Sequence, residues 1–317
     1  MSILNQARAL AQSGRGSEAR TLVQSAAERG DTEALLAVAH WRLHGLYGPR
    51  DLADSHRLLD RARQAGSTEA TLLLATLVGN GTGVAADYEK ARALLASIAP
   101  QDADAAAQLA LLDRMQQLDC LEQLPAERLS DDPAVRLVRG LISLDECSYL
   151  ISRAAPLLQP SVIIDPSGRR LPHPTRTSAG MSFGPLEEDL VVNALNRRIA
   201  AITGTQPSWG EPLHVLRYAP GQEYKPHVDA LPGVENQRRW TALLYLNNEY
   251  EAGETDFDQL GIVARGEPGD ALIFANAADD GRPDYRTRHA GRPVASGTKW
   301  LATRWIRQAP YDPWTGR

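Results

Sequence analysis

The chain has 317 residues, which suggests about two domains, and its 43% hydrophobic and 23% charged residues are typical of a soluble globular protein. The formal net charge of −5 gives no reason to expect nucleic acid or an acidic membrane as a partner. No apolar run approaches the roughly 20 residues of a membrane helix, and the N-terminus lacks the pattern of a signal peptide. Two cysteines imply no disulfide framework, so we expect a cytoplasmic protein.

Residues 1–112 have the composition of helices and repeat on themselves. They are rich in Ala and Leu, and Asp31 and Ser67 stand as plausible N-caps of equivalent helices. Similar residues recur 36 positions apart, as at Leu22, Leu58 and Leu94. This period predicts an α-solenoid of tetratricopeptide type, and its small residues resemble the Sel-like variety. We expect residues such as Gly45 and Gly81 to let paired helices approach closely.

Two interpretations of these repeats stay open. One is a concave surface that docks a protein, for example a protein or peptide substrate, and the other is a scaffold that binds nothing. His40, Trp41, His44 and Tyr47 fall near one helix end, where they would line a groove. His40 and His44 have the i, i+4 spacing of metal ligands, but no third ligand accompanies them. Capping or packing is therefore the favoured role for both.

Residues 113–133 lose the repeat and contain turn signals, so we interpret them as a linker. The remainder, residues 134–317, is predicted to be a second domain that opens with a strand over 135–142. Ser143 and Glu146 form a capping-box pattern that begins a helix reaching about residue 158. Leu144 and Cys147 are predicted to lie on the buried stripe of that helix.

Residues 160–184 have the Pro, Gly and Ser content of a loop, in which His173 is predicted to be exposed. A second amphipathic helix is predicted over 187–202. From Leu213 onwards the pattern changes to short strands between Gly and Pro turns, which predicts a sandwich or jelly roll. The predicted strands cover residues 213–218, 240–246, 254–257, 262–265, 270–274, 286–294 and 299–306.

His227 and Asp229 stand two residues apart, which on a strand directs both side chains to one face. A second histidine is available at His289. Two histidines and one carboxylate form the facial triad of non-haem Fe(II) oxygenases. Lys299 follows ten residues later, where its charge would hold the far carboxylate of a keto-acid co-substrate. Zinc in a hydrolase is the competing interpretation, but it leaves Lys299 unexplained.

Five ordered blocks of sequence resemble the Fe(II)/2-oxoglutarate-dependent dioxygenases, and within them the prolyl 4-hydroxylases. The resemblance covers roughly residues 134–307. The blocks are R-Y-A-P-G-Q-E-Y-K-P-H-V-D (217–229), G-E-T-D-F (253–257), G-D-A-L-I-F (269–274), R-H-A-G-R-P-V (288–294) and K-W-L-A-T-R-W-I (299–306). This resemblance implies a double-stranded β-helix (jelly roll) with supporting helices. The whole chain is then an α+β multidomain protein with α-solenoid repeats at its N-terminal end.

The resemblance also implies the cofactors and the residues that hold them. Fe(2+) would be bound by His227, Asp229 and His289, with 2-oxoglutarate and O2 as co-substrates and ascorbate as a further reductant. Lys299 would pair with 2-oxoglutarate. The resemblance also places Tyr218, Tyr245 and Trp305 at the co-substrate, although Trp305 has the alternative role of a wall of the core. Thr303 lies four residues beyond Lys299, hence on the same strand face, where it would add a donor.

Arg176 and Tyr224 correspond to positions near the substrate in this family, although Arg176 has the alternative role of closing its loop onto the barrel. The implied activity resembles that of a procollagen-proline 4-dioxygenase: hydroxylation of prolyl residues in a protein or peptide, with release of succinate and CO2. Two alternatives stay open. The substrate is a free amino acid or other small molecule, or the fold is catalytically idle and serves as a binding adaptor.

Overall fold

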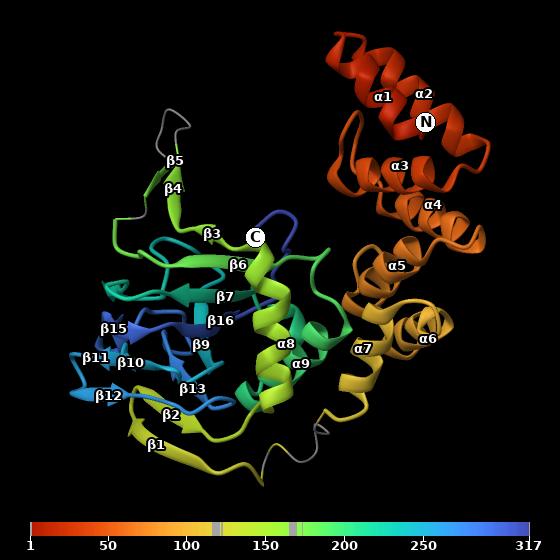
Figure 1. The fold of residues 1–317 in the computed structure, drawn as a ribbon. Coiled ribbons are helices and arrows are strands. Elements are labelled where there is room, and N and C mark those ends of the chain that lie inside the picture. Colours follow the sequence, from red (N-terminus) through yellow and green to blue (C-terminus); the bar gives the residue numbers. More distant parts are fainter. Residues whose placement is uncertain (1, 116–120, 122, 165–169, 173, 317) are drawn as a thin grey trace. The chain divides into compact units, whose positions relative to one another are not determined.

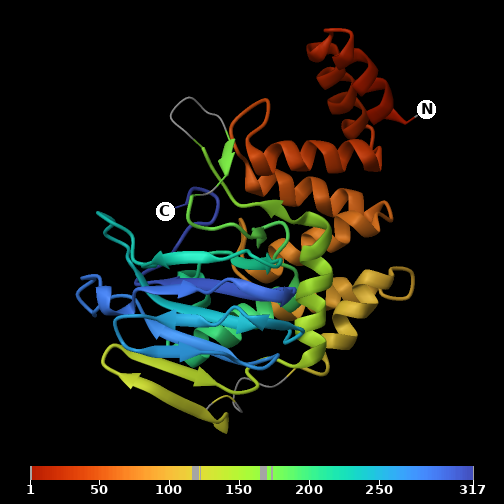
Figure 2. The same ribbon diagram turned by 60° about the vertical axis from the view of Figure 1, so that its left-hand side comes forward.

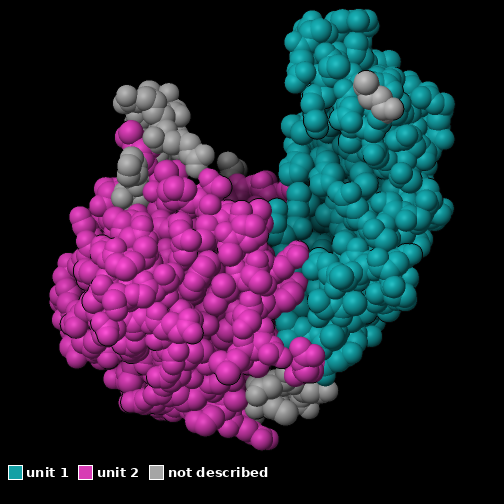
Figure 3. Space-filling view, in the orientation of Figure 1, with its two compact units in different colours: residues 1–113, 185–193 teal, residues 114–184, 194–317 magenta. Residues whose placement is uncertain are grey.

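The structure is a computed structural model that describes residues 2–115, 121, 123–164, 170–172 and 174–316. The prediction for His173 lies outside these residues. The chain clusters into two compact units, coloured separately in Figure 3. Unit 1 comprises residues 1–113 and 185–193, and unit 2 comprises residues 114–184 and 194–317. No helix among the described residues has both the length and the apolar character needed to span a membrane.

Unit 1 is built from successive helices that pack side by side in chain order (Figure 1). Helices α2 and α4 begin 36 residues apart, as do α3 and α5, so the structural repeat has the period read from the sequence. The predicted α-solenoid is confirmed. Its helices are α1 (Ile3–Gln12), α2 (Gly16–Glu28), α3 (Thr32–His44), α4 (Leu52–Gln64), α5 (Thr68–Asn80), α6 (Tyr88–Ile98) and α7 (Ala103–Leu112).

The helix ends of unit 1 follow from local chemistry. The Asp31 carboxylate accepts from the Ala34 amide and the Ser67 hydroxyl from the Ala70 amide, as predicted for N-caps. Gly45 and Gly81 have a different role from the one expected. Both end a helix in the left-handed region, with φ of 66° and 77°, which a residue without a side chain adopts at little cost.

Unit 2 is dominated by antiparallel sheets (Figures 1 and 2). Among the described residues, the larger sheet has eight strands in the order β1 (Ala126–Asp131), β2 (Ala134–Val138), β13 (Ala271–Ala275), β9 (Arg238–Tyr245), β16 (Lys299–Arg307), β7 (Leu213–Tyr218), β6 (Ala179–Phe183) and β3 (Gln159–Pro160). A second sheet has the order β12 (Ile262–Ala264), β11 (Thr255–Phe257), β14 (His289–Gly291) and β8 (Tyr224–His227). Two short ribbons pair β10 (Tyr250–Ala252) with β15 (Val294–Gly297), and β4 (Val162–Ile164) with β5 (Arg170–Pro172).

The two main sheets enclose the hydrophobic core of unit 2. Leu243 and Leu272 of the larger sheet cluster with Phe257 of the smaller one. On the opposite face of the larger sheet, Arg304 donates to the Asn196 carbonyl of helix α9 (Leu190–Thr203) over 2.8 Å. The predicted double-stranded β-helix with supporting helices is therefore confirmed, and the chain is an α+β multidomain protein.

Helix α8 (Leu144–Ala154) begins at the predicted capping box and continues into a short 3-10 turn (Ala155–Leu157). Cys147 is buried as predicted, but Leu144 is 65% exposed. Leu144 is the first residue of the helix, so it precedes the turn that packs on the sheet. Two further 3-10 turns cover Pro207–Trp209 and Tyr285–Thr287.

Three local differences from the predicted strands have physical causes. Strand β1 falls inside the predicted linker, because its sequence A-E-R-L-S-D lacks apolar alternation. The stretch predicted as one strand over 286–294 contains a 3-10 turn, β14 and the first residue of β15 instead. Strand β8 was absent from the list of predicted strands, since its four residues include a proline, although the argument for the metal ligands had placed His227 on a strand.

Candidate metal centre and co-substrate cavity

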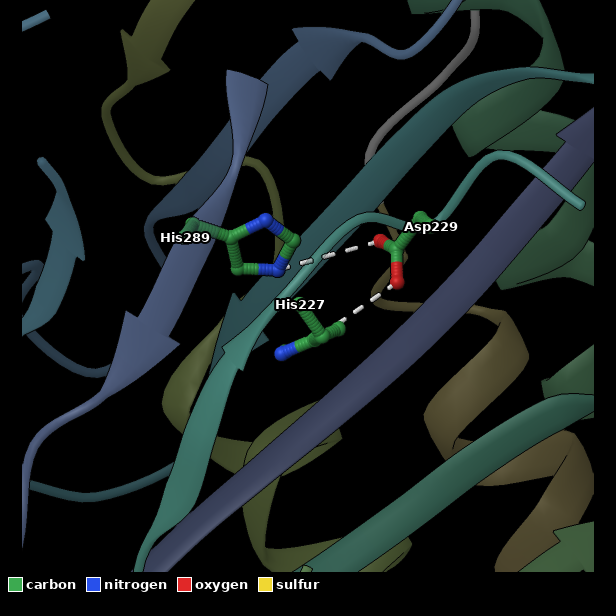
Figure 4. A group of neighbouring side chains, drawn as sticks. All are labelled: His227, Asp229 and His289. Atoms are coloured by element: carbon green, nitrogen blue, oxygen red, sulfur yellow. Dashed lines mark ion pairs between the residues drawn. The ribbon is translucent and has the colours of Figure 1, made fainter. Parts of the chain in front are cut away.

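Two facing strands and one bend bring together the predicted metal ligands (Figure 4). His227 is the last residue of β8 and lies opposite His289, the first residue of β14. Asp229 lies two residues beyond the end of β8, so it does not share a strand with His227 as the sequence argument assumed. The potential ligand atoms of the three side chains nevertheless lie within 4.8 Å of one another. Within the described part of the chain, this is the only such group of His, Cys, Asp or Glu side chains.

The two imidazoles are oriented by backbone carbonyls. His227 Nδ1 lies 2.9 Å from the Lys225 oxygen, and His289 Nδ1 lies 3.0 Å from the Thr287 oxygen. Because a carbonyl oxygen only accepts, both Nδ1 atoms carry the proton and both Nε2 atoms keep a lone pair. The Nε2 atoms lie 3.5 and 3.9 Å from the Asp229 oxygens. Lone pairs thus converge on one point, which is an arrangement that fits a cation.

The charge states of the site match those of metal ligands. Burial lowers the pKa of His289 to about 4, so its imidazole is neutral near pH 7. Burial alone would raise the pKa of Asp229, but its neighbours His227, His289 and Thr241 lower that pKa below the usual range. A neutral imidazole beside an ionised carboxylate is the form that binds a divalent metal.

Asp229 is held in place by a chain of two hydrogen bonds. The Asn276 amide donates to the Thr241 hydroxyl over 2.8 Å, and that hydroxyl donates to Asp229 Oδ2 over 2.6 Å. Thr241 has a single hydroxyl proton, so accepting from Asn276 directs it toward the carboxylate. Both supporting side chains are buried. Neither Thr241 nor Asn276 was singled out in the sequence, because their contact with Asp229 arises only from strand pairing.

A cavity of about 430 Å³, counted with the space open to solvent, lies beside the three ligands. Thr303 and Trp305 lie four and six residues beyond Lys299 on β16, so the alternation of the strand puts all three on the cavity side. The predicted residues that line it are Arg176, Tyr218, Tyr224, His227, Asp229, His289, Lys299, Thr303 and Trp305. Five further lining residues were missed in the sequence: Leu216, Leu243, Thr255, Gly291 and Leu301. Leu216 and Leu301 were detectable, since each stands two residues from a predicted site residue on the same strand.

Lys299 is a buried cation without a carboxylate partner among the described residues. It is 3% exposed, and its ammonium donates to the Gly253 carbonyl over 2.7 Å. Burial lowers the pKa of Lys299 to about 8. An ammonium has three donors, and a buried charge without a counter-ion is costly. The site therefore fits an anionic group entering the cavity.

Tyrosine rings surround this ammonium. The Lys299 nitrogen lies 5.7, 5.9 and 6.0 Å from the ring centres of Tyr218, Tyr245 and Tyr250. Burial raises the pKa of Tyr218 to about 12, so its hydroxyl stays protonated and can donate. Tyr245 is buried next to Lys299 but does not line the cavity, and Tyr250 was not anticipated.

Arg176 and Tyr224 lie at the cavity side by side. Their backbones form an antiparallel bridge, and the guanidinium carbon of Arg176 lies 5.5 Å from the Tyr224 ring centre. Arg176 Nε also donates to the Ser161 hydroxyl over 3.1 Å. The Tyr224 ring stacks on the His227 ring at 3.5 Å between centres. Arg176 therefore forms a hydrogen bond within its own segment of the chain and also lines the cavity.

Trp305 also lines the cavity. The guanidinium carbon of Arg238 lies 4.0 Å from its ring centre, and Arg238 forms a two-point ion pair with Glu211. The Trp305 indole nitrogen is buried and has no hydrogen-bond partner among the described residues. His214, which was predicted to be structural, bonds through Nδ1 to the Ser182 hydroxyl at 2.6 Å and does not line the cavity.

The candidate site lies within a stretch of the chain that matches a known family. The profile of the 2OG-Fe(II) oxygenase superfamily matches residues 213–307, from β7 to the end of β16. Prolyl 4-hydroxylase 1 of Arabidopsis thaliana is 36% identical over 202 residues, which cover 57% of this chain and 71% of the relative. Probable prolyl 4-hydroxylase 3 of the same plant is 32% identical over 210 residues, covering 58% and 73%.

A solved structure also resembles part of the chain. The viral collagen prolyl hydroxylase of Paramecium bursaria Chlorella virus-1, in its 2OG complex, is 27% identical with a TM-score of 0.45 and covers 55% of this chain and 96% of its own. The fold, the site and the sequence identities together define an oxygenase that depends on iron and 2-oxoglutarate. The chain belongs to the prolyl 4-hydroxylase family of 2OG-Fe(II) oxygenases. Its family uses Fe(2+), 2-oxoglutarate and O2.

Proposed function

We propose that this protein hydroxylates prolyl residues in a protein or peptide and releases succinate and CO2. The observation that carries the proposal is one cavity lined both by His227, Asp229 and His289 and by the buried Lys299, which has no carboxylate partner among the described residues. A dicarboxylic keto-acid that binds a metal needs two binding groups. One is the metal site itself, and the other is a cation without a counter-ion that can pair with the far carboxylate. The intact set argues against a catalytically idle adaptor.

Each residue has a defined task in this proposal. When bound, Fe(II) supplies the oxygen chemistry that converts a C–H bond to an alcohol while 2-oxoglutarate is oxidised and decarboxylated. His227, Asp229 and His289 hold the metal through two lone pairs and a carboxylate, and the chain from Asn276 through Thr241 keeps that carboxylate in place. Lys299 neutralises the far carboxylate of 2-oxoglutarate.

The remaining residues of the cavity position the co-substrate and the substrate. The Tyr218 and Thr303 hydroxyls lie on the same side as Lys299 and are available to the co-substrate. Tyr224 and Trp305 are aromatic walls that exclude water and suit a ring such as that of proline. The names of the prolyl 4-hydroxylase relatives support a prolyl substrate.

We also propose that the two parts of the chain have different functions. The repeats, residues 1–112, recruit the client, and residues 134–317 form the oxygenase domain. Residues 113–133 join them, although β1 within this stretch pairs with β2. The cytoplasmic setting and the use of ascorbate stay predictions.

Labelled oxygen tests the proposed reaction. Lysate from cells that lack this protein would be incubated with the protein, Fe(II), 2-oxoglutarate and heavy O2, beside a His227→Ala control. Mass spectrometry would search peptides and metabolites. We expect label on prolines of one or a few proteins, and none with the variant. Label confined to a free amino acid or another small metabolite would replace the prolyl substrate with the small-molecule alternative.

A further inference from the structure

A second concave site lies in unit 1, within the first repeat. Residues from α1, α2, α3 and the loop after α3 line a groove of about 1210 Å³, counted with the space open to solvent. Small side chains such as Ala11 and Ala37 line part of the groove and leave room against the helices. Because the groove is open to solvent and is lined by several elements of the chain, a segment of polypeptide can enter it.

The charged side chains of this groove form no ion pair with any residue that the structure describes. Arg8 and Arg20 line it, and no Asp or Glu is among its described lining residues. Arg15, just outside the groove, pairs with Glu18 instead. Within the described part of the chain, neither Arg8 nor Arg20 forms an ion pair, and Arg20 instead lies 5.5 Å from the ring centre of Tyr47. The groove therefore presents two uncompensated positive charges.

Tyr47 is the most unusual residue of the groove. Its backbone is left-handed, with φ of 60°, a conformation that costs free energy for any residue with a side chain. The equivalent position one repeat later, 36 residues on, is Gly83, with φ of 74°. The next repeat therefore has a glycine at this position, whereas the first repeat has a tyrosine in spite of the strain. The Tyr47 side chain is 64% exposed, so burial of its ring does not offset that strain.

The ring of Tyr47 instead extends an aromatic wall. It meets the Trp41 ring edge-on, with 4.9 Å between centres, and both residues line the groove. Aromatic side chains and arginines dominate the binding energy of protein interfaces, because they combine large apolar area with polar atoms. Trp41, Tyr47 and the two arginines make up such a set.

We propose that this groove docks an acidic peptide segment that carries at least one aliphatic or aromatic side chain. Carboxylates of the segment pair with Arg8 and Arg20, and its apolar side chain packs between Trp41 and Tyr47. Charge complementarity selects this occupant over a neutral or basic one. The site is separate from the oxygenase cavity, and the proposal does not depend on which substrate that cavity oxidises.

Peptide selection tests the groove with the full-length chain. A library of random twelve-residue peptides would be selected on the parent protein, and the enriched peptides would be measured by fluorescence anisotropy. We expect enrichment in Asp and Glu around an apolar residue, and binding that weakens as salt is added. Enriched peptides without an excess of acidic residues would overturn the proposal.

Four variants locate the binding. Arg20→Glu should weaken peptide binding at least tenfold, whereas Arg29→Glu, an exposed arginine of the same unit outside the groove, should leave it unchanged. Tyr47→Gly should weaken binding while the melting temperature stays at or above that of the parent, because glycine relieves the left-handed strain. His227→Ala should bind the peptides normally. Full binding by Arg20→Glu, or loss of binding in His227→Ala, would contradict the assignment to this groove.

Discussion

The Asp229 carboxylate accepts a hydrogen bond from Thr241, a residue that does not line the cavity. Thr241→Val keeps the size of the side chain but removes the donor to Asp229 Oδ2. We expect Fe(II) binding to weaken roughly 10- to 100-fold, the usual effect of losing a group that orients a metal ligand. Anaerobic competition against a coloured chelator would measure it. Thr203→Val is the matched control, since that buried hydroxyl donates to the Ile199 carbonyl within α9. Equal affinities for the two variants would show that Asp229 needs no such support.

Lys299 is predicted to serve the co-substrate and not the metal. Lys299→Met should weaken 2-oxoglutarate binding by about 30-fold or more, because the incoming carboxylate would be left unpaired. The ligand-free variant should also be more stable than the parent near pH 7, since it no longer buries a charge. Calorimetry and thermal unfolding would report both effects. A fall in Fe(II) affinity with unchanged 2-oxoglutarate affinity would assign Lys299 another role.

The lowered pKa of Lys299 also predicts a pH dependence. Its folded-state pKa of about 8 lies below its ordinary value of 10.5, so the ammonium begins to lose its charge below pH 8 and is about half charged at pH 8. The affinity for 2-oxoglutarate should therefore be level well below that pH and decline as the pH rises through it. The stability of the ligand-free protein should change in the opposite sense and rise between about pH 8 and pH 10.5. In Lys299→Met the contribution of this group to both profiles should vanish; a decline of equal slope there would place the titration elsewhere.

Spacing in the sequence was sufficient to single out the three candidate metal ligands and Lys299, but not five of the other residues that line the cavity, nor those that support Asp229. His227, Asp229, His289 and Lys299 belong to motifs in which the chemistry fixes the residue type. Thr241 carries no such signal, because many buried strands contain threonine. Its role depends on a strand register that brings it to Asp229, and no local pattern encodes that register.

At the scale of elements, helix α8 is fixed by one carboxylate with two tasks. Glu146 accepts from the Ser143 amide over 2.7 Å to complete the capping box. It also forms a two-point ion pair with Arg198 of α9 at 2.8 and 3.0 Å, and both charged side chains are buried. The capping pattern was visible in the sequence. The ion pair with Arg198, 52 residues away, was not visible in the sequence.

These two tasks differ in their predicted cost. Ser143→Ala removes only the cap and should lower the free energy of unfolding by about 1 kcal/mol. Glu146→Ala leaves the Arg198 guanidinium buried without its counter-charge, and should cost about 3–5 kcal/mol. Urea denaturation of both variants would measure the difference. Similar small losses would mean that water or another acceptor compensates Arg198.

Strands were predictable where the alternation was regular. The prediction for β7 matched the structure over Leu213–Tyr218, and that for β16 ended one residue short. Strand β1 and the proline-containing β8 lack regular alternation and were absent from the list of predicted strands. The pairing of β8 with β14, which places His227 opposite His289, is a tertiary fact that neither sequence segment contains.

For the whole molecule, composition separated the helical repeats from the sheet-rich region. The compact units also divide after residue 113, but segment 185–193 clusters with unit 1. Within that unit, Asn80 Nδ2 donates to the Pro185 carbonyl over 2.7 Å. Neither periodicity nor composition shows that a later segment packs with an earlier unit. The sequence therefore offered no means of predicting this clustering.

The central claim is that one cavity holds Fe(II) through the triad and 2-oxoglutarate through both the metal and Lys299. Anaerobic calorimetry of 2-oxoglutarate binding, with and without Fe(II), tests it most directly in the parent, His289→Ala and Lys299→Met proteins. We predict tight binding only in the parent with Fe(II), strong weakening in Lys299→Met, and no metal-dependent gain in His289→Ala. Binding to the parent that is equally tight without Fe(II), or a full metal-dependent gain in His289→Ala, would contradict the account.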